Sequence, residues 1–143
     1  MMDASGVIGT LRVIGWSFVP VVVGGLLYVG FGVSGRDPAD DDLGRIGLVV
    51  AAVIGVGGLA AAVVWRNRVT DRPVAPRRLS TTFFITLAVA EAAMLVGFTF
   101  TLISHVAAPF LVGAGAFTLA LVTMLSSLGQ VELVAAEAMR PER

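Results

Sequence analysis

Glu91 is the residue whose type and position offer the most chemistry in this sequence. It lies near the middle of a long apolar stretch. A carboxyl is costly in such surroundings unless a cation, a water path or a hydrogen-bond partner lies nearby. A carboxyl of this kind is suited to carrying protons. It is equally suited to a hydrogen bond with a backbone carbonyl, or with a Ser or Thr hydroxyl of a neighbouring helix.

Other polar residues are weaker candidates for a site. His105 is the only histidine, and no second ligand accompanies it in the apolar stretches, so we expect no haem or metal site there. The cluster of Asp40, Asp41 and Asp42 is more typical of a solvated acidic loop than of a cation site. The sequence has no cysteine, no phosphate-binding glycine loop and no nucleophile paired with a base. We therefore expect no cofactor, no metal and no catalysis by this chain alone, and its net charge of zero gives no argument for nucleic acid as a partner.

Long apolar stretches must position these residues. The chain has 143 residues, of which 57% are hydrophobic and 14% charged, whereas about 25% charged residues is typical of soluble domains. Apart from Glu91, its charges lie in short segments outside apolar runs of roughly 20 residues, the length that crosses a bilayer. We predict an all-α bundle of four transmembrane helices in one domain, residues 1–143, and interpret the first run as a retained helix rather than a cleaved signal. The predicted spans cover residues 13–33, 46–65, 82–104 and 109–128, followed by a cytoplasmic tail, residues 129–143.

The segments between the spans differ in charge, and this difference predicts the orientation. Residues 66–81 include five arginines and one aspartate, whereas residues 34–45 include four aspartates and two arginines. Because short arginine-rich segments stay in the cytoplasm, we expect both termini on the cytoplasmic side of the inner (plasma) membrane. We also expect four of the arginines to lie beside anionic lipid headgroups, namely Arg66, Arg68, Arg77 and Arg78.

Small residues recur along three predicted helices at spacings of three and four, which places them on one face of each helix. Lipid gives little hydrophobic drive for association, so such faces favour close helix packing, either within the bundle or between copies of the chain. The first predicted helix carries Pro20 near its middle, and we expect a kink there. The small faces consist of Gly47, Ala51, Gly55, Gly58 and Ala62; of Thr86, Ala90, Ala93 and Gly97; and of Gly113, Ala116, Ala120, Thr123 and Ser127.

Glu91 lies on a different face of its helix from these small residues. At about 100° per residue its neighbours are large and apolar, and the small face is on the other side of the helix. We therefore predict that Glu91 faces lipid or a protein partner. No other charged side chain lies deep in a predicted span, so any counter-charge would come from another subunit. The predicted face neighbours are Phe84, Leu87, Met94, Leu95 and Phe98.

The stretch from Arg78 to Phe98, RLSTTFFITLAVAEAAMLVGF, resembles the carboxyl-bearing helix of the proteolipid c subunit of rotary ATP synthases. The shared features are a basic segment before the helix, a mid-membrane acid followed by Ala92, Gly97 several residues later, and a glycine-rich run at 55–58 in the preceding helix. The resemblance covers the second and third predicted helices. The chain differs by a longer connecting segment, a broken glycine repeat and one additional helix on each side. The resemblance implies that Glu91 binds an ion, and that this ion is a proton, because the polar ligands of the sodium-binding versions are missing.

Two functions from different classes follow from these features. The first is an accessory or scaffold subunit that assembles with other membrane subunits, or with itself, through its small faces. We favour this function because the sequence holds no catalytic groups. The second is a proton-translocating, proteolipid-like subunit or transporter component that uses Glu91. Membrane lipid is a partner in both.

Overall fold

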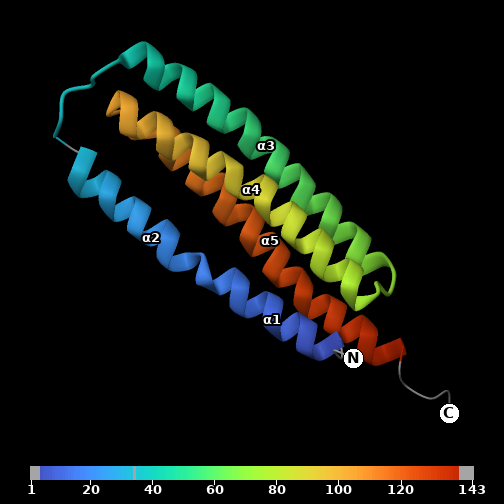
Figure 1. Cartoon of the computed structure of the whole chain (residues 1–143). Helices are drawn as coiled ribbons and strands as arrows, with labels where there is room; N and C mark the ends of the chain where they lie inside the picture. The colour runs from blue at the N-terminus through green and yellow to red at the C-terminus, as the bar shows by residue number, and fades with distance from the viewer. Residues whose placement is uncertain (1–3, 34, 139–143) are drawn as a thin grey trace.

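The computed structural model describes residues 4–33 and 35–138, and over these residues it contains helices and no strand (Figure 1). Four stretches are long and apolar enough to cross a membrane, namely Ser5–Val33, Asp41–Asp71, Pro76–Ser104 and Ala108–Val134. They confirm the predicted all-α fold class with four transmembrane helices, and they define a multi-pass membrane protein. In chain order the elements are α1 (Ala4–Ser17), α2 (Val19–Tyr28), the π-helical turn η1 (Val29–Val33), α3 (Asp41–Asp71), α4 (Pro76–Ser104) and α5 (Ala108–Ala138).

The helices extend beyond the apolar runs that predicted them. α3 begins at Asp41 because the side chain of Asp40 caps it, accepting a hydrogen bond from the Leu43 N–H at 2.9 Å. It continues to Asp71 through residues that are polar but compatible with a helix. The connection to α4 is consequently residues 72–75, much shorter than the segment 66–81 expected from hydropathy.

The turn between α4 and α5 is tight and accounts for His105. His105 adopts the left-handed conformation, with φ of 57°, and its N–H donates to the Thr101 carbonyl at 3.0 Å. This geometry closes the end of α4. The Thr101 hydroxyl accepts from the Phe110 N–H at 3.1 Å, which joins the last turn of α4 to the first turn of α5. His105 therefore has a structural position as the helix C-cap.

α3, α4 and α5 form a three-helix core whose backbones touch. A Cβ atom added at Gly58 would lie 2.8 Å from the Cα of Ala90, and one at Gly55 would lie 2.7 Å from the Cβ of Ala116. A Cβ added at Gly113 would collide with the Ala93 carbonyl. Such close approach is the use that membrane helices make of small residues. Buried members of the three small faces are Gly47, Ala51, Gly55, Gly58, Ala62, Thr86, Ala90, Ala93, Gly97, Gly113, Ala120 and Ser127, while Ala116 and Thr123 are half-buried.

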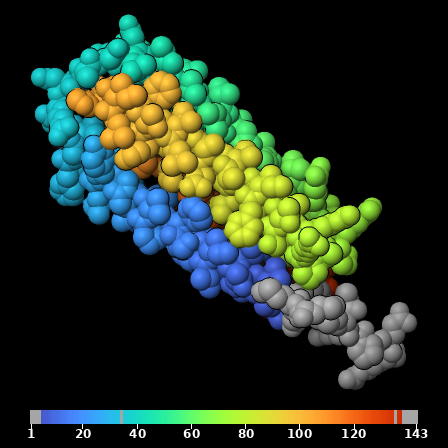
Figure 2. Space-filling view, in the orientation of Figure 1, coloured from blue at the N-terminus to red at the C-terminus, as the bar shows by residue number. Residues whose placement is uncertain are grey.

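The α1–α2 arm, residues 4–28, lies along α4 and α5 but is packed less closely (Figures 1 and 2). A kink was expected at Pro20, and the helix is interrupted just before it: α1 ends at Ser17, and Pro20 lies in the first turn of α2 because its ring cannot continue the preceding helix. No residue of α2 is buried. The arm contacts the core at separate points, among them the edge-to-face pair of Phe18 and Phe117 at 5.6 Å and the pair of Tyr28 and Phe98 at 5.7 Å.

Candidate functional site at Glu91

α4 holds Glu91 near its midpoint, at the edge of the packed face. The small residues on the other side of α4 are buried against α3 and α5. Glu91 itself is half-buried. Its carboxyl therefore belongs to the rim of the core rather than to its interior.

The neighbours of Glu91 along α4 show where this rim runs. Leu87 and Met94, one turn to either side, are each 3% exposed. Leu95 and Phe84 on the adjoining side are 53% and 44% exposed. Glu91 thus separates side chains that pack inside the bundle from side chains that face lipid.

No described residue supplies a partner for the Glu91 carboxyl. Hydroxyl groups of other spans bond to their own helices instead: Thr118 donates to the Ala114 carbonyl at 2.8 Å and Ser17 to the Ile14 carbonyl at 2.6 Å. Among the described residues, every fully buried side-chain nitrogen or oxygen has a partner. The unpartnered carboxyl oxygens of Glu91 are therefore accessible from outside the bundle.

A groove of about 320 Å³ runs between α2 and α4 next to this position. Met94 and Leu95, the groove residues nearest in sequence to Glu91, follow it by about one helical turn. Figure 2 shows the first span and α4 side by side over this face. The groove is apolar apart from the Tyr28 hydroxyl, so it offers space for an acyl chain or an apolar side chain but no continuous set of polar groups. The lining residues are Val21, Gly24, Gly25, Tyr28, Met94, Leu95, Phe98 and Phe110.

The structure separates the other predicted polar site residues from Glu91. Arg66 and Arg68 lie in the last turns of α3, and Arg77 and Arg78 lie in the first turn of α4, so all four gather at one end of the bundle. Asp40 is a helix cap. Over residues 4–33 and 35–138, no three His, Asp or Glu side chains are placed to hold a metal ion together.

Two polar contacts between helices were not expected from the sequence. The Trp65 indole N–H donates to the Thr82 hydroxyl at 3.1 Å and links α3 to α4. The Arg12 guanidinium and the Glu132 carboxylate form an ion pair at 3.0 Å that links α1 to α5. Residues 12 and 132 are far apart in sequence and on different helices, so no local spacing pattern indicates that they meet.

Comparisons with protein-family models, with curated proteins and with solved structures find no match to this chain. The interpretation of the site therefore depends on the geometry of the chain itself.

Proposed function

We propose that this protein is an accessory or scaffold subunit of a membrane complex, and that it binds a partner transmembrane helix through the Glu91 carboxyl. The observation that carries the proposal is a half-buried, mid-span carboxyl without a partner among the described residues. Polar groups in a bilayer core are costly unless they are hydrogen-bonded, so a second polar group at the same depth would stabilise the assembly.

The packing of the small faces favours a partner of a different kind over a ring of identical chains. Gly55, Gly58 and Ala93 are already in contact inside the core, so these residues are not free to join two copies. The outward faces carry larger side chains, such as Val53 and Leu119, which are 68% and 60% exposed. A partner helix carrying a polar side chain near its midpoint fits the Glu91 rim better than a second copy joined through the small faces.

Substitutions at Glu91 test this proposal. Glu91→Leu should release the partner from the detergent-solubilised complex, whereas Glu91→Gln should retain it, because an amide can still donate and accept hydrogen bonds. An interhelical hydrogen bond in a bilayer contributes about 0.6–2 kcal/mol, so the loss should be severalfold to about thirtyfold in affinity. Thr99→Leu is the matched control, since Thr99 is an exposed polar residue of α4 that bonds to its own helix. Equal recovery of the partner with Glu91→Leu and the wild-type chain would rule out this role.

Proton translocation is the second candidate, favoured by the accessibility of the Glu91 carboxyl from outside the bundle. Under this alternative, which agrees with the resemblance to proteolipid c subunits, Glu91 binds a proton at the interface with another subunit. Glu91→Gln then retains assembly but abolishes proton transport in vesicles, and a carbodiimide labels Glu91 in the wild-type chain. The scaffold function predicts instead that Glu91→Gln leaves the function of the complex intact. This one variant therefore separates the two functions.

The proposed orientation places both termini and the arginine-bearing loop, residues 72–75, on the cytoplasmic side of the inner membrane. The support is the excess of arginine around this loop, because arginine-rich segments are retained in the cytoplasm. A reporter inserted in residues 72–75 should be active only as a cytoplasmic fusion. A periplasmic signal would reverse the orientation without affecting the argument about Glu91.

A further inference from the structure

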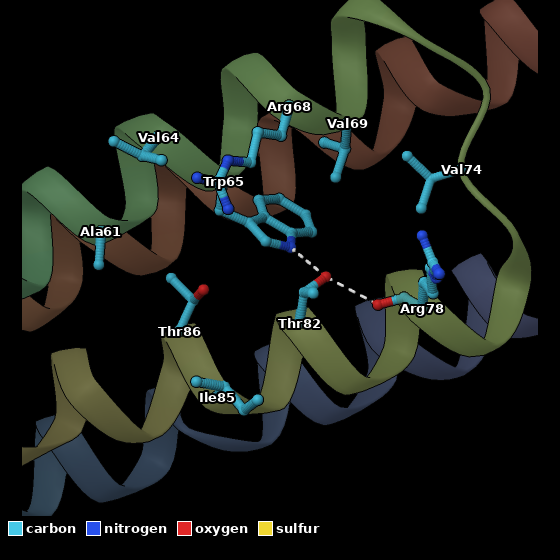
Figure 3. A pocket seen from close by; sticks show the side chains of 10 residues that line it. All are labelled: Ala61, Val64, Trp65, Arg68, Val69, Val74, Arg78, Thr82, Ile85 and Thr86. Carbon is cyan, nitrogen blue, oxygen red and sulfur yellow. Dashed lines mark hydrogen bonds between the residues drawn. The ribbon is translucent and has the colours of Figure 1, made fainter.

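A second groove, of about 360 Å³, lies between the arginine-bearing ends of α3 and α4 (Figure 3). Its walls are apolar towards the middle of the membrane, where Ala61, Val64 and Ile85 lie. Arg78 from α4 lies at the other end, near Val74, and the side chain of Arg68 from α3 extends back over Trp65 towards Val64. The hydrogen bond between Trp65 and Thr82 fixes the two walls relative to each other. The groove thus combines apolar walls with one guanidinium group from each helix.

The groove is long enough to span most of one leaflet of a bilayer. From Ala61 to Arg68 the rise along α3 is on the order of 10 Å, and from Arg78 to Thr86 along α4 it is about 12 Å. Half of a typical hydrocarbon core is about 15 Å. A lipid whose headgroup lies at the arginines would therefore have much of one acyl chain alongside the apolar part of the groove.

The arginines at this end have no acidic partner. Among the described residues, ion pairs join Arg12 to Glu132 and Arg45 to Asp42, and neither includes Arg68 or Arg78. The segment 66–78 contains five arginines and one aspartate. Unpaired guanidinium groups beside an apolar groove attract an anion that carries an apolar tail, and guanidinium is well suited to bidentate hydrogen bonding with phosphate.

A comparison of two helix starts strengthens this charge argument. α3 begins with the Asp40 cap and with Asp41 and Asp42 in its first turn, which suits the partial positive charge of a helix N-terminus. α4 begins without a side-chain cap and without an acid in its first turn, and it carries Arg77 and Arg78 there instead. The positive charge at the start of α4 is therefore uncompensated within the described chain, and an external anion would stabilise it.

We propose that this groove binds one anionic glycerophospholipid, with its phosphate bound by the side chains of Arg68 and Arg78 and one acyl chain along Ala61, Val64 and Ile85. The lipid neutralises the start of α4 and covers an apolar surface that the three-helix core leaves open. This site is distinct from Glu91 and does not depend on the scaffold function.

Lipid binding to the full-length protein in detergent tests the proposal, with native mass spectrometry used to compare phosphatidylglycerol and phosphatidylcholine of identical acyl chains. The wild-type chain should retain one phosphatidylglycerol at least about tenfold more tightly than phosphatidylcholine. The double substitution R68Q/R78Q should remove this preference. The matched control R36Q/R45Q removes two arginines from the other end of the bundle and should leave the preference intact.

A second pair of variants tests the acyl-chain part of the site. Ala61→Trp should fill the groove and weaken phosphatidylglycerol binding with both arginines in place, whereas Ala60→Trp on the neighbouring exposed position should not. Ile85→Trp fills the groove from α4 if Ala61→Trp prevents folding, as judged by helical circular dichroism. Retained lipid preference in R68Q/R78Q would overturn the site. An equal loss of the preference in R36Q/R45Q would show that the arginines attract anionic lipid without a specific site, and would overturn the proposal. Wild-type phosphatidylglycerol binding by folded groove-filling variants would overturn it as well.

Discussion

The three-helix core and the α1–α2 arm associate in the same bilayer by different kinds of contact. In the core, backbones touch at Gly58 and Gly113, where even a methyl group has no space. In the arm, α1 buries side chains such as Ile8 and Leu11, and Phe18 contacts Phe117, but the α2 segment has no buried residue. The difference shows that a span can be apolar enough to cross a membrane without being closely packed in the bundle. Close packing requires small residues in register on two helices, and the arm meets large side chains instead.

The core should respond most strongly to a change of one methyl group. Gly58→Ala places a Cβ 2.8 Å from the Ala90 backbone, so the helices must separate, and overpacking of this kind costs about 1–3 kcal/mol. Gly57→Ala is the matched control, because nothing lies within 4 Å of its added Cβ and alanine is the better helix former. Unfolding by SDS titration in mixed micelles should rank Gly57→Ala at or above wild type and Gly58→Ala clearly below it. Equal stabilities for the two variants would contradict the close backbone contact.

The arm should respond less, and locally, to loss of its central contact. Phe18→Ala removes the edge-to-face pair with Phe117, a contact of about 0.5–1.5 kcal/mol beyond the area it buries. We expect the arm to separate more often from the core while α3, α4 and α5 stay packed. Spin labels on the arm and on α5 should report a broader distance distribution in this variant. Phe31→Ala, at a side chain that is 86% exposed, should leave the distribution unchanged.

The smallest effect is expected from the ion pair that joins α1 to α5. Arg12 and Glu132 are about half exposed, and an exposed ion pair contributes at most about 0.5–1 kcal/mol before screening. Arg12→Gln should therefore lower the free energy of unfolding by less than Gly58→Ala does. Added salt should lower the stability of the wild-type chain slightly, by screening the ion pair, but should not change that of Arg12→Gln. Arg36→Gln serves as the control for the lost charge. A larger effect than that of Phe18→Ala would show that the ion pair, rather than the aromatic contact, holds the arm.

Much of the architecture could be predicted because hydropathy and proline act locally. The four spans follow from the length of the apolar runs, and the break before Pro20 follows from its missing N–H. Helix ends were predicted less well, because a helix continues through polar residues such as Arg66 wherever its hydrogen bonds and caps allow. The short loop 72–75 and the joint position of Arg68 and Arg78 therefore emerged only in the structure.

The candidate site was likewise determined partly by the sequence and partly by the tertiary structure. The sequence alone determined that Glu91 is a carboxyl in the middle of a span, on a different helix face from Ala90 and Ala93, because helical periodicity fixes which residues share a face. Only the tertiary structure decided that the small faces are used inside the core, that Glu91 lies at its rim without a described partner, and that two arginines from different helices flank one groove. These facts depend on contacts between helices that are distant in sequence, and in lipid such contacts are set by shape complementarity rather than by a pattern along any one helix.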